Sequence, residues 1–294
     1  MDNKKLEIMK EKPGFIAALD QSGGSSAKTL RLYGINEDQY NGEDEMFDLI
    51  HAMRARVMKS KAFTSSKIIG VILFEQTMDR EIDGKPTSEY LWDKGIVSFL
   101  KVDKGLAEEV NGCQMMKDIP NLDETLDRAV AKGIFGTKMR SVIKHADADA
   151  IRNVVHQQFE IAKRIWAHGL VPIIEPEVDI NAPDKIQCEE LLHAEVVREL
   201  DLLEPDVKVM FKFTIPYFAN FYQDLMDNEH VVRIVALSGG YTNKDACEKL
   251  AMNNGMIASF SRALLEGLNV NDSEEEFDNK LEASIDQIYQ ASIK

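Results

Sequence analysis

The 294-residue sequence has few cysteines and no short motif that would bind a structural metal ion. Cys113, Cys188 and Cys247 are widely spaced and form no CxxC pair, so neither a disulfide framework nor a zinc site is indicated. The histidines show no HxH or HExxH spacing, which argues against zinc-dependent catalysis. Isolated thiols fit a reducing compartment, and we expect a cytoplasmic protein.

The sequence also lacks a basic excess and any long apolar run. Its formal net charge is −15, which argues against nucleic acid or an anionic membrane as a partner. A local basic patch can still bind an anionic substrate. Residues 1–7 are charged where a signal peptide would turn apolar, and no run is long enough to span a bilayer. We therefore expect a soluble protein.

One short apolar run carries a lysine in its middle. Val209–Thr214 has the pattern of a strand, whose alternation places Phe211 and Phe213 on one face and Lys212 on the other. A buried lysine must find partners or lose its proton, because desolvation disfavours the charged form. Lys212 is therefore either part of a structural ion pair or a nucleophile toward a carbonyl group.

Three earlier apolar runs carry a charged residue at a similar point. These residues are Lys101, Lys138 and Glu175, and together with Lys212 they are equally spaced along the chain. No residue-level repeat accompanies the spacing. We interpret it as successive βα units, each of which delivers a charged side chain at the carboxyl end of its strand.

Apolar runs and helical patterns alternate along the whole chain. The runs that we predict to be strands cover residues 14–20, 68–74, 96–103, 134–140, 171–177, 209–214, 234–237 and 255–260. The predicted helices include one over residues 218–226 and a last one over 273–293, which begins with a Ser273–Glu276 capping box. Pro176 indicates that its strand ends there.

Eight alternations of strand and helix predict a (β/α)8 TIM barrel, an α/β fold, with flanking helices at the N-terminal and C-terminal ends. The length fits a single catalytic domain over residues 1–294. Such a barrel carries its active site at the carboxyl ends of its strands.

The charged residues lie at the predicted carboxyl ends of the strands, where such a barrel carries its active site. The predicted barrel mouth holds Asp20, Lys101, Lys138, Glu175, Glu177 and Lys212, with Asp103 and Arg140 close by, and the turns 22–25 and 238–240. A turn of glycine and serine before a helix suits a phosphate group, although such residues are also common in ordinary turns. Ion-pair networks occur at barrel ends too, so a structural role for each charge alone remains open.

A lysine beside a second lysine and carboxylates is suited to Schiff-base catalysis. A neighbouring cation such as Lys138 and an apolar wall would favour the neutral amine of Lys212. Glu175 is a candidate acid and base for forming and dehydrating a carbinolamine. Asp20 is a candidate base that takes a hydroxyl proton as a carbon–carbon bond breaks.

In their order along the chain, these motifs resemble those of the class I fructose-1,6-bisphosphate aldolases, in a shorter, bacterial-like form. The matching segments cover nearly the whole chain and are Asp20-Gln21-Ser22-Gly23-Gly24-Ser25, residues 70–74, Lys101-Val102-Asp103-Lys104-Gly105, Lys138-Met139-Arg140, residues 172–177, Lys212, residues 237–240 and residues 261–264.

The resemblance implies reversible cleavage of D-fructose 1,6-bisphosphate to dihydroxyacetone phosphate and D-glyceraldehyde 3-phosphate, in glycolysis and gluconeogenesis. It implies a lysine Schiff base, with no metal and no other cofactor. The implied catalytic residues are Lys212 as the Schiff-base lysine, Glu175 as general acid and base, Glu177 as its neighbour in proton transfer, Lys138 acting on the substrate hydroxyls, and Asp20 assisting cleavage between C3 and C4. The implied substrate-binding residues are Ser238, Gly239, Gly240 and Arg262 for one phosphate, Ser22, Ser25 and Lys101 for the other, and Arg140.

The sequence departs from the animal members at four positions. Gln21 stands where they have glutamate, Thr29 where they have arginine, and Phe260-Ser261 where they have Tyr-Gly. The animal members end in a tyrosine, whereas this sequence has Lys294 at its last position. We therefore assign no role to its tail.

Three alternatives remain open. A different Schiff-base aldolase would keep the lysine but act on another phosphorylated sugar. A zinc-dependent aldolase would need clustered histidines. A sugar-phosphate sensor or scaffold could use the same barrel without turnover, because fold alone does not imply function. A homo-oligomer is compatible with the sequence, which leaves the oligomeric state open.

Overall fold

The computed structural model describes residues 2–294, which are built around eight parallel strands. In their order around the sheet they are β1 (Phe15–Leu19), β2 (Ile68–Leu73), β5 (Val97–Lys101), β7 (Gly136–Ile143), β8 (Val171–Val178), β9 (Val209–Thr214), β10 (Val231–Leu237) and β11 (Ile257–Ala258). Each pairs in parallel with the next. The Ala18 N–H donates to the Phe260 carbonyl oxygen (3.2 Å) and links the last strand back to the first. The result is the nearly closed (β/α)8 barrel that the sequence predicted.

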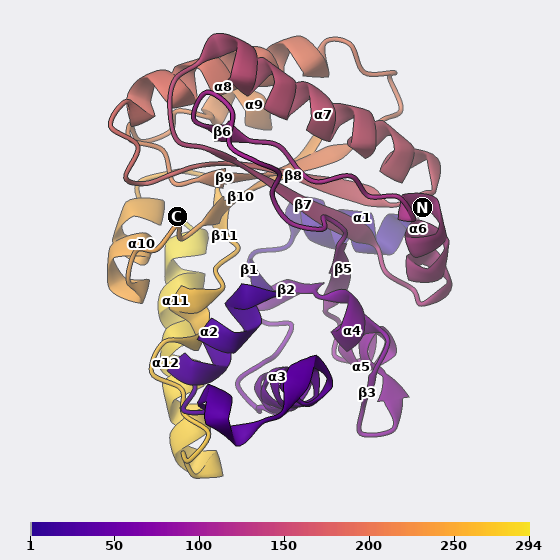
Figure 1. Cartoon of the computed structure of the whole chain (residues 1–294), viewed down its shortest axis with the longest axis vertical. Helices are drawn as coiled ribbons and strands as arrows, with labels where there is room; N and C mark the ends of the chain where they lie inside the picture. Colours follow the sequence, from indigo (N-terminus) through magenta and orange to yellow (C-terminus); the bar gives the residue numbers. More distant parts are fainter. Residues whose placement is uncertain (1) are drawn as a thin grey trace.

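Helices surround the strands. They are α1 (Asn3–Glu11), α2 (Gly24–Leu32), α3 (Gly42–Lys59), α4 (Glu75–Met78), α5 (Thr87–Asp93), α6 (Leu122–Ala131), α7 (Ala148–Ala167), α8 (Lys185–Leu200), α9 (Gln223–Met226), α10 (Asn243–Leu250), α11 (Arg262–Leu265) and α12 (Glu274–Ser292). The remaining short elements are η1 (Glu37–Gln39), β3 (Glu81–Ile82), β4 (Lys85–Pro86) and β6 (Cys113–Gln114). Figure 1 shows α7 and α8 at the top of the view and α3 and α12 at the bottom, with the strands between them. None of the helices within residues 2–294 combines the length and the apolar composition needed to cross a bilayer.

Strand alternation separates two apolar layers. In β9, Phe211 packs outward against Phe159 of α7, with ring centroids 6.0 Å apart, and Phe213 stacks on Tyr222 at 4.3 Å. Met210, on the other face, belongs to the apolar cluster inside the barrel. Because residues two apart share a face, Lys212 points into the barrel with Met210, as the sequence predicted.

The amino-terminal end of the barrel is closed by α1. Met9 is fully buried within the interior cluster, and its carbonyl oxygen accepts a hydrogen bond from Arg233 Nε (2.8 Å). At the other end of the chain, α12 packs against α10 and α11. It begins at the predicted capping box, where Ser273 Oγ accepts from the Glu276 N–H (3.3 Å). Both flanking helices are present, and only the carboxyl ends of the strands remain open.

The prediction of a helix over residues 218–226 is wrong except for the last turn, Gln223–Met226. Only α9 is helical there, because Asn220 has a φ of 62°, a left-handed conformation that interrupts a right-handed helix. The Asn220 N–H donates to Asn253 Oδ1 (2.9 Å), and the Asn220 side-chain oxygen accepts from the Asn254 N–H (2.7 Å). These tertiary contacts hold an irregular segment where the local pattern favoured a helix.

The expectation that the strand ends at Pro176 is also wrong, because β8 continues beyond it. The N–H groups of Val171 and Asp179 both donate toward β7. Between them, β8 pairs with β9 only at Ile173 and Ile174, and the Glu175 N–H donates to the Gln158 side chain (2.9 Å). Pro176, which has no N–H, thus stands where the hydrogen-bond ladder is already interrupted.

Candidate active site

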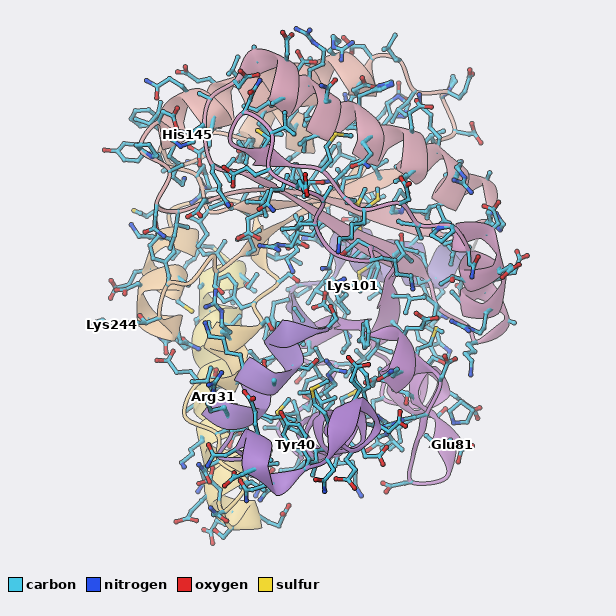
Figure 2. All side chains as sticks on the ribbon, viewed as in Figure 1. Arg31, Tyr40, Glu81, Lys101, His145 and Lys244 are labelled. Carbon is cyan, nitrogen blue, oxygen red and sulfur yellow. The ribbon has the colours of Figure 1, made fainter. Side chains whose placement is uncertain are left out.

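A cavity of about 580 Å³ opens at the carboxyl ends of the strands. Its lining includes Asp20, Ser22, Ser25, Lys101, Lys138, Arg140, Glu175, Glu177, Lys212, Ser238, Gly239 and Arg262. All of these were candidates from the sequence. Figure 2 places Lys101 near the centre of the molecule, whereas His145 and Lys244 lie at its rim. Gly240 is the exception among the candidates, since it lines a neighbouring cavity of about 270 Å³ that shares Arg262.

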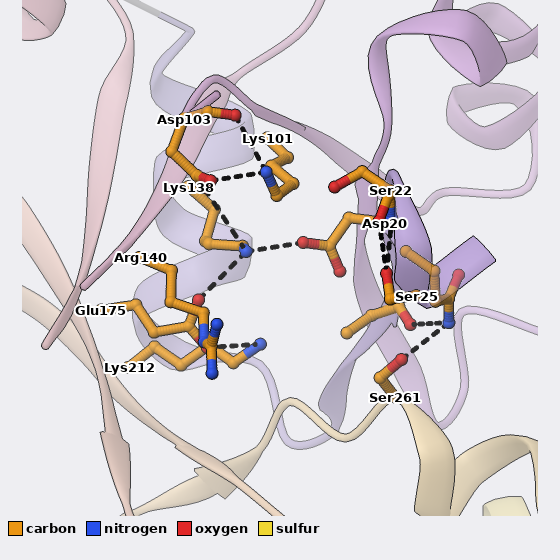
Figure 3. A network of polar contacts seen from close by, with 12 residues as sticks. Asp20, Ser22, Ser25, Lys101, Asp103, Lys138, Arg140, Glu175, Lys212 and Ser261 are labelled. Carbon is orange, nitrogen blue, oxygen red and sulfur yellow. Dashed lines mark hydrogen bonds and ion pairs between the residues drawn. The ribbon is translucent and has the colours of Figure 1, made fainter. Parts of the chain in front are cut away.

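Lys138 lies at the centre of a cluster of buried charges. Its Nζ is 2.7 Å from Asp20 Oδ2, 3.0 Å from Glu175 Oε2 and 4.0 Å from Asp103 Oδ2 (Figure 3). Burial opposes its charge, but these three carboxylates outweigh burial and raise the pKa of Lys138 well above its usual value. Lys138 is therefore a permanent cation.

No group of three or more histidine, cysteine or acidic side chains within residues 2–294 is arranged to hold a metal ion.

Glu175 bridges two lysines. Its Oε1 is 3.2 Å from Lys212 Nζ, and its other oxygen contacts Lys138. The Lys212 side chain is only 5% exposed. The Glu175 N–H donates to the side-chain oxygen of Gln158 on α7 (2.9 Å), which holds this part of β8 in place. A separation of 3.2 Å permits direct proton transfer between Glu175 and Lys212.

Asp20 is an ionised carboxylate in this cluster. Burial alone would raise its pKa, but the ammonium groups of Lys138, Lys212 and Lys101 outweigh burial and lower the pKa of Asp20 below its usual value. Asp20 can therefore accept a proton or a hydrogen bond at neutral pH.

The lowered pKa of Asp20 predicts how stability depends on pH. A carboxyl group whose pKa is lower in the folded protein stabilises the fold above its unfolded pKa of about 3.9, and this stabilisation is lost as the pH falls toward the folded pKa. Asp20→Asn should reduce the slope of unfolding free energy against pH below about pH 4, by up to about 1.4 kcal/mol per pH unit. Urea unfolding from pH 2 to pH 6 measures the slope. If the variant has the same slope as the wild type, Asp20 does not interact with the cation cluster.

Two further cations of the cavity, Lys101 and Arg140, are each paired with an acid. Lys101 Nζ donates to Asp103 Oδ1 (2.6 Å) and to the Asp103 carbonyl oxygen (2.9 Å). Burial lowers the pKa of Lys101, although Asp103 opposes this effect. Arg140 Nε donates to Glu177 Oε2. These pairs fix the positions of the cations along the cavity wall.

Two turns offer groups suited to a phosphate. In the turn after β1, the Ser22 N–H donates to Ser25 Oγ (2.8 Å), and the Ser25 hydroxyl donates to the Ser22 carbonyl oxygen (2.7 Å). In the turn after β10, Gly239 has a φ of 61°, and a Cβ there would lie 2.5 Å from Ile180 Cγ2. Only glycine fits that position without a shift of the neighbouring chain. Arg262 follows β11 and completes the second group.

Some residues of the site were not predicted from the sequence. Ser259 lines the cavity, is buried, and has no hydrogen-bond partner for its hydroxyl within the described part of the chain. Lys28 of α2 also lines it. Gln158 left a usable signal, because it is a polar residue inside the apolar stripe of α7, between Val155 and Phe159.

Fold and site together define the class of protein: a (β/α)8 barrel whose mouth holds a lysine against a buried carboxylate. The model of the family described as fructose-bisphosphate aldolase class-I matches residues 3–214 of the chain. This match covers well over half of the sequence, and the chain therefore belongs to the class-I fructose-bisphosphate aldolase family. It is accordingly a lyase of the aldolase class.

Solved structures with the same fold include a fructose-bisphosphate aldolase from Plasmodium falciparum, in a ternary complex with TRAP and a small-molecule inhibitor. The TM-score is 0.80 at 20% sequence identity, over 99% of this chain and 94% of that one. A sugar phosphate isomerase/epimerase from Parabacteroides distasonis matches with a TM-score of 0.44 at 16% identity, over 95% of this chain and 94% of that one. At these identities the first match supports the fold.

Proposed function

We propose that this protein cleaves D-fructose 1,6-bisphosphate reversibly into dihydroxyacetone phosphate and D-glyceraldehyde 3-phosphate, through an imine on Lys212. The family supports an aldolase, and the observation that carries the mechanism is the 3.2 Å contact between Lys212 Nζ and Glu175 Oε1. An amine can act as a nucleophile only when it is neutral. Transfer of a proton from Lys212 to Glu175 produces that neutral amine inside the cavity.

The reaction then follows from the positions of the acids. Lys212 attacks the C2 carbonyl carbon, and Glu175 returns its proton to the carbinolamine hydroxyl, which leaves as water. The resulting iminium accepts the electron pair of the C3–C4 bond, while Asp20 takes the proton of the C4 hydroxyl. Glyceraldehyde 3-phosphate leaves, and the enamine takes up a proton at C3 that balances the one lost to Asp20. Water then hydrolyses the iminium, which releases dihydroxyacetone phosphate and the free Lys212 amine. Lys138 stays positive throughout and holds the carboxylates of Asp20 and Glu175 in place, because its ammonium contacts both of them.

Two phosphate groups require cations in a protein of strongly negative net charge. Besides Lys138 and Lys212, four cations line the cavity: Lys28, Lys101, Arg140 and Arg262. The lining cations outnumber the lining carboxylates Asp20, Asp103, Glu175 and Glu177, so the cavity is a basic island. Such an island attracts a bisphosphate even though the net charge of the chain is −15, because a ligand responds to the local field. We assign the phosphate near C1 to Ser238, Gly239 and Arg262, with Gly240 adjoining, and the phosphate near C6 to Ser22, Ser25 and Lys101.

The rest of the proposed biology follows the family. We propose one catalytic domain over residues 1–294, working in the cytoplasm in glycolysis and gluconeogenesis, without a metal ion or other cofactor. A coupled assay for triose phosphate tests the reaction itself. A sensor or scaffold on this barrel predicts sugar-phosphate binding without any triose phosphate, and an aldolase for another sugar predicts turnover of that sugar alone.

Arg262→Lys tests the assigned phosphate contact. Lysine keeps the charge but loses the planar fork that matches a phosphate, so we expect KM for fructose 1,6-bisphosphate to rise about tenfold while turnover is largely retained. Steady-state kinetics in the coupled assay measure both constants. Arg31→Lys changes an exposed arginine of α2 outside the cavity and serves as the control. An unchanged KM for Arg262→Lys would show that this residue does not bind the phosphate.

A further inference from the structure

The barrel is least paired at its seam, the junction of β11 and β1. The two-residue strand β11 pairs with β10 on one side, and toward β1 the Ala18 N–H bonds to the Phe260 carbonyl oxygen. Just beyond this contact, the Gln21 side chain crosses the seam, and its Nε2 donates to Ser261 Oγ (2.7 Å). Figure 3 shows Ser261 on the same wall as Ser25, facing the lysines. We call this hydrogen bond the Gln21–Ser261 bridge.

The bridge joins the two turns that carry the phosphate-binding candidates. Gln21 lies between Asp20 and Ser22 in the turn after β1. Ser261 immediately precedes Arg262 in the turn after β11. Both bridge residues line the large cavity. A single hydrogen bond between side chains 240 residues apart in sequence therefore links the two turns directly.

A buried arginine fixes the orientation of the Gln21 amide. Arg54 on α3 is fully buried, and its Nη2 donates to the Gln21 carbonyl oxygen (2.5 Å) and to Gln21 Oε1 (3.1 Å). Its Nη1 donates to Thr77 Oγ1 (2.8 Å). Burial lowers the pKa of Arg54 to about 10, which leaves it charged at neutral pH. Because a guanidinium only donates, the amide oxygen must face Arg54 and the amide NH₂ must face Ser261.

We propose that Gln21 and Ser261 are positioning residues that hold the two phosphate-binding turns at the separation a bisphosphate requires. The inference rests on the proposed function and deepens it, since it concerns how that site selects its substrate. A sugar with a phosphate at both ends must contact both turns at once, whereas a sugar with one phosphate needs only one of them. The bridge therefore raises the preference for fructose 1,6-bisphosphate over fructose 1-phosphate by pre-organising the cavity.

Ser261→Ala removes the acceptor and tests the bridge. We expect KM for fructose 1,6-bisphosphate to rise about 3- to 10-fold, the usual worth of one hydrogen bond, with kcat nearly unchanged. KM for fructose 1-phosphate should change by less than about twofold. Ser261→Thr keeps a hydroxyl at the same place and should restore the wild-type ratio of the two KM values. A loss of packing alone would affect both substrates alike and would not follow the hydroxyl.

Gln21→Met removes the donor at nearly constant shape, together with the oxygen that Arg54 binds, and completes a double-mutant cycle. If Ser261 acts through Gln21, the double variant is no worse than Gln21→Met alone. Additive losses would mean that Ser261 contacts the phosphate on its own, and this result would overturn the bridge. Ser284→Ala is the control, because Ser284 ties α12 to the Leu264 carbonyl oxygen (3.0 Å) and does not line the cavity.

The wild-type protein separates this proposal from the function on which it rests. If the wild type cleaves neither sugar, the proposed function fails, and the bridge fails with it. If the wild type cleaves fructose 1,6-bisphosphate but Ser261→Ala keeps the same ratio of KM values, only the bridge is overturned.

Discussion

Borohydride added to the protein with dihydroxyacetone phosphate is expected to leave a stable adduct on Lys212. An iminium is a covalent bond that borohydride reduces to a secondary amine, whereas a lysine that only pairs with the substrate yields no adduct. Mass spectrometry should find the added mass on the peptide that contains Phe211-Lys212-Phe213. We expect labelling to be unaffected by a chelator, because a zinc-polarised carbonyl would need the metal and an imine does not.

The neighbouring lysines are internal controls for this experiment. The charge of Lys138 is held by three carboxylates and that of Lys101 by Asp103, so both should remain unmodified. Lys212→Arg should abolish labelling and reduce turnover to background, because a guanidinium stays protonated and forms no imine. An adduct on Lys138 would mean that the nucleophile lies on another strand. Full activity without any adduct would contradict the Schiff-base mechanism.

Glu175→Gln is expected to lower turnover by about 10² to 10⁴, the usual contribution of general acid–base catalysis, while substrate binding survives. The amide keeps the shape of the carboxylate and can still accept a hydrogen bond from Lys138, but it cannot take a proton from Lys212. Coupled kinetics give the turnover, and borohydride trapping gives the fraction of imine formed. The trapping rate should fall together with turnover, because Glu175 acts in both the formation and the dehydration of the carbinolamine.

Glu189→Gln provides a matched control for this substitution. Glu189 is also a buried glutamate paired with a lysine, since it contacts Lys185, but it lies on α8 outside the cavity. Its replacement should lower stability without a comparable loss of turnover. If Glu175→Gln turns over at the wild-type rate, the proton carrier is another group, and Glu177, which pairs with Arg140, is the next candidate.

The sequence by itself determined the order of the eight strands and most of the charged residues that face the site. Side chains in a strand alternate with a period of two, so the run around Lys212 could place that lysine opposite Phe211 and Phe213 without any knowledge of the fold. Parallel strands in a barrel present their carboxyl ends at one mouth, so charges at the ends of successive strands had to gather there. These inferences hold because they depend on local backbone geometry and on one topological rule.

Only the tertiary structure decided which groups meet. No local pattern specifies that Lys138 stands among three carboxylates, that Gly240 lies outside the main cavity, or that Gln21 reaches Ser261. The same reason explains the wrong helix at Asn220, where contacts with another loop override the local preference for helix. Distances between side chains depend on strand register, barrel closure and rotamers, and these are set by packing among segments that are far apart in the sequence.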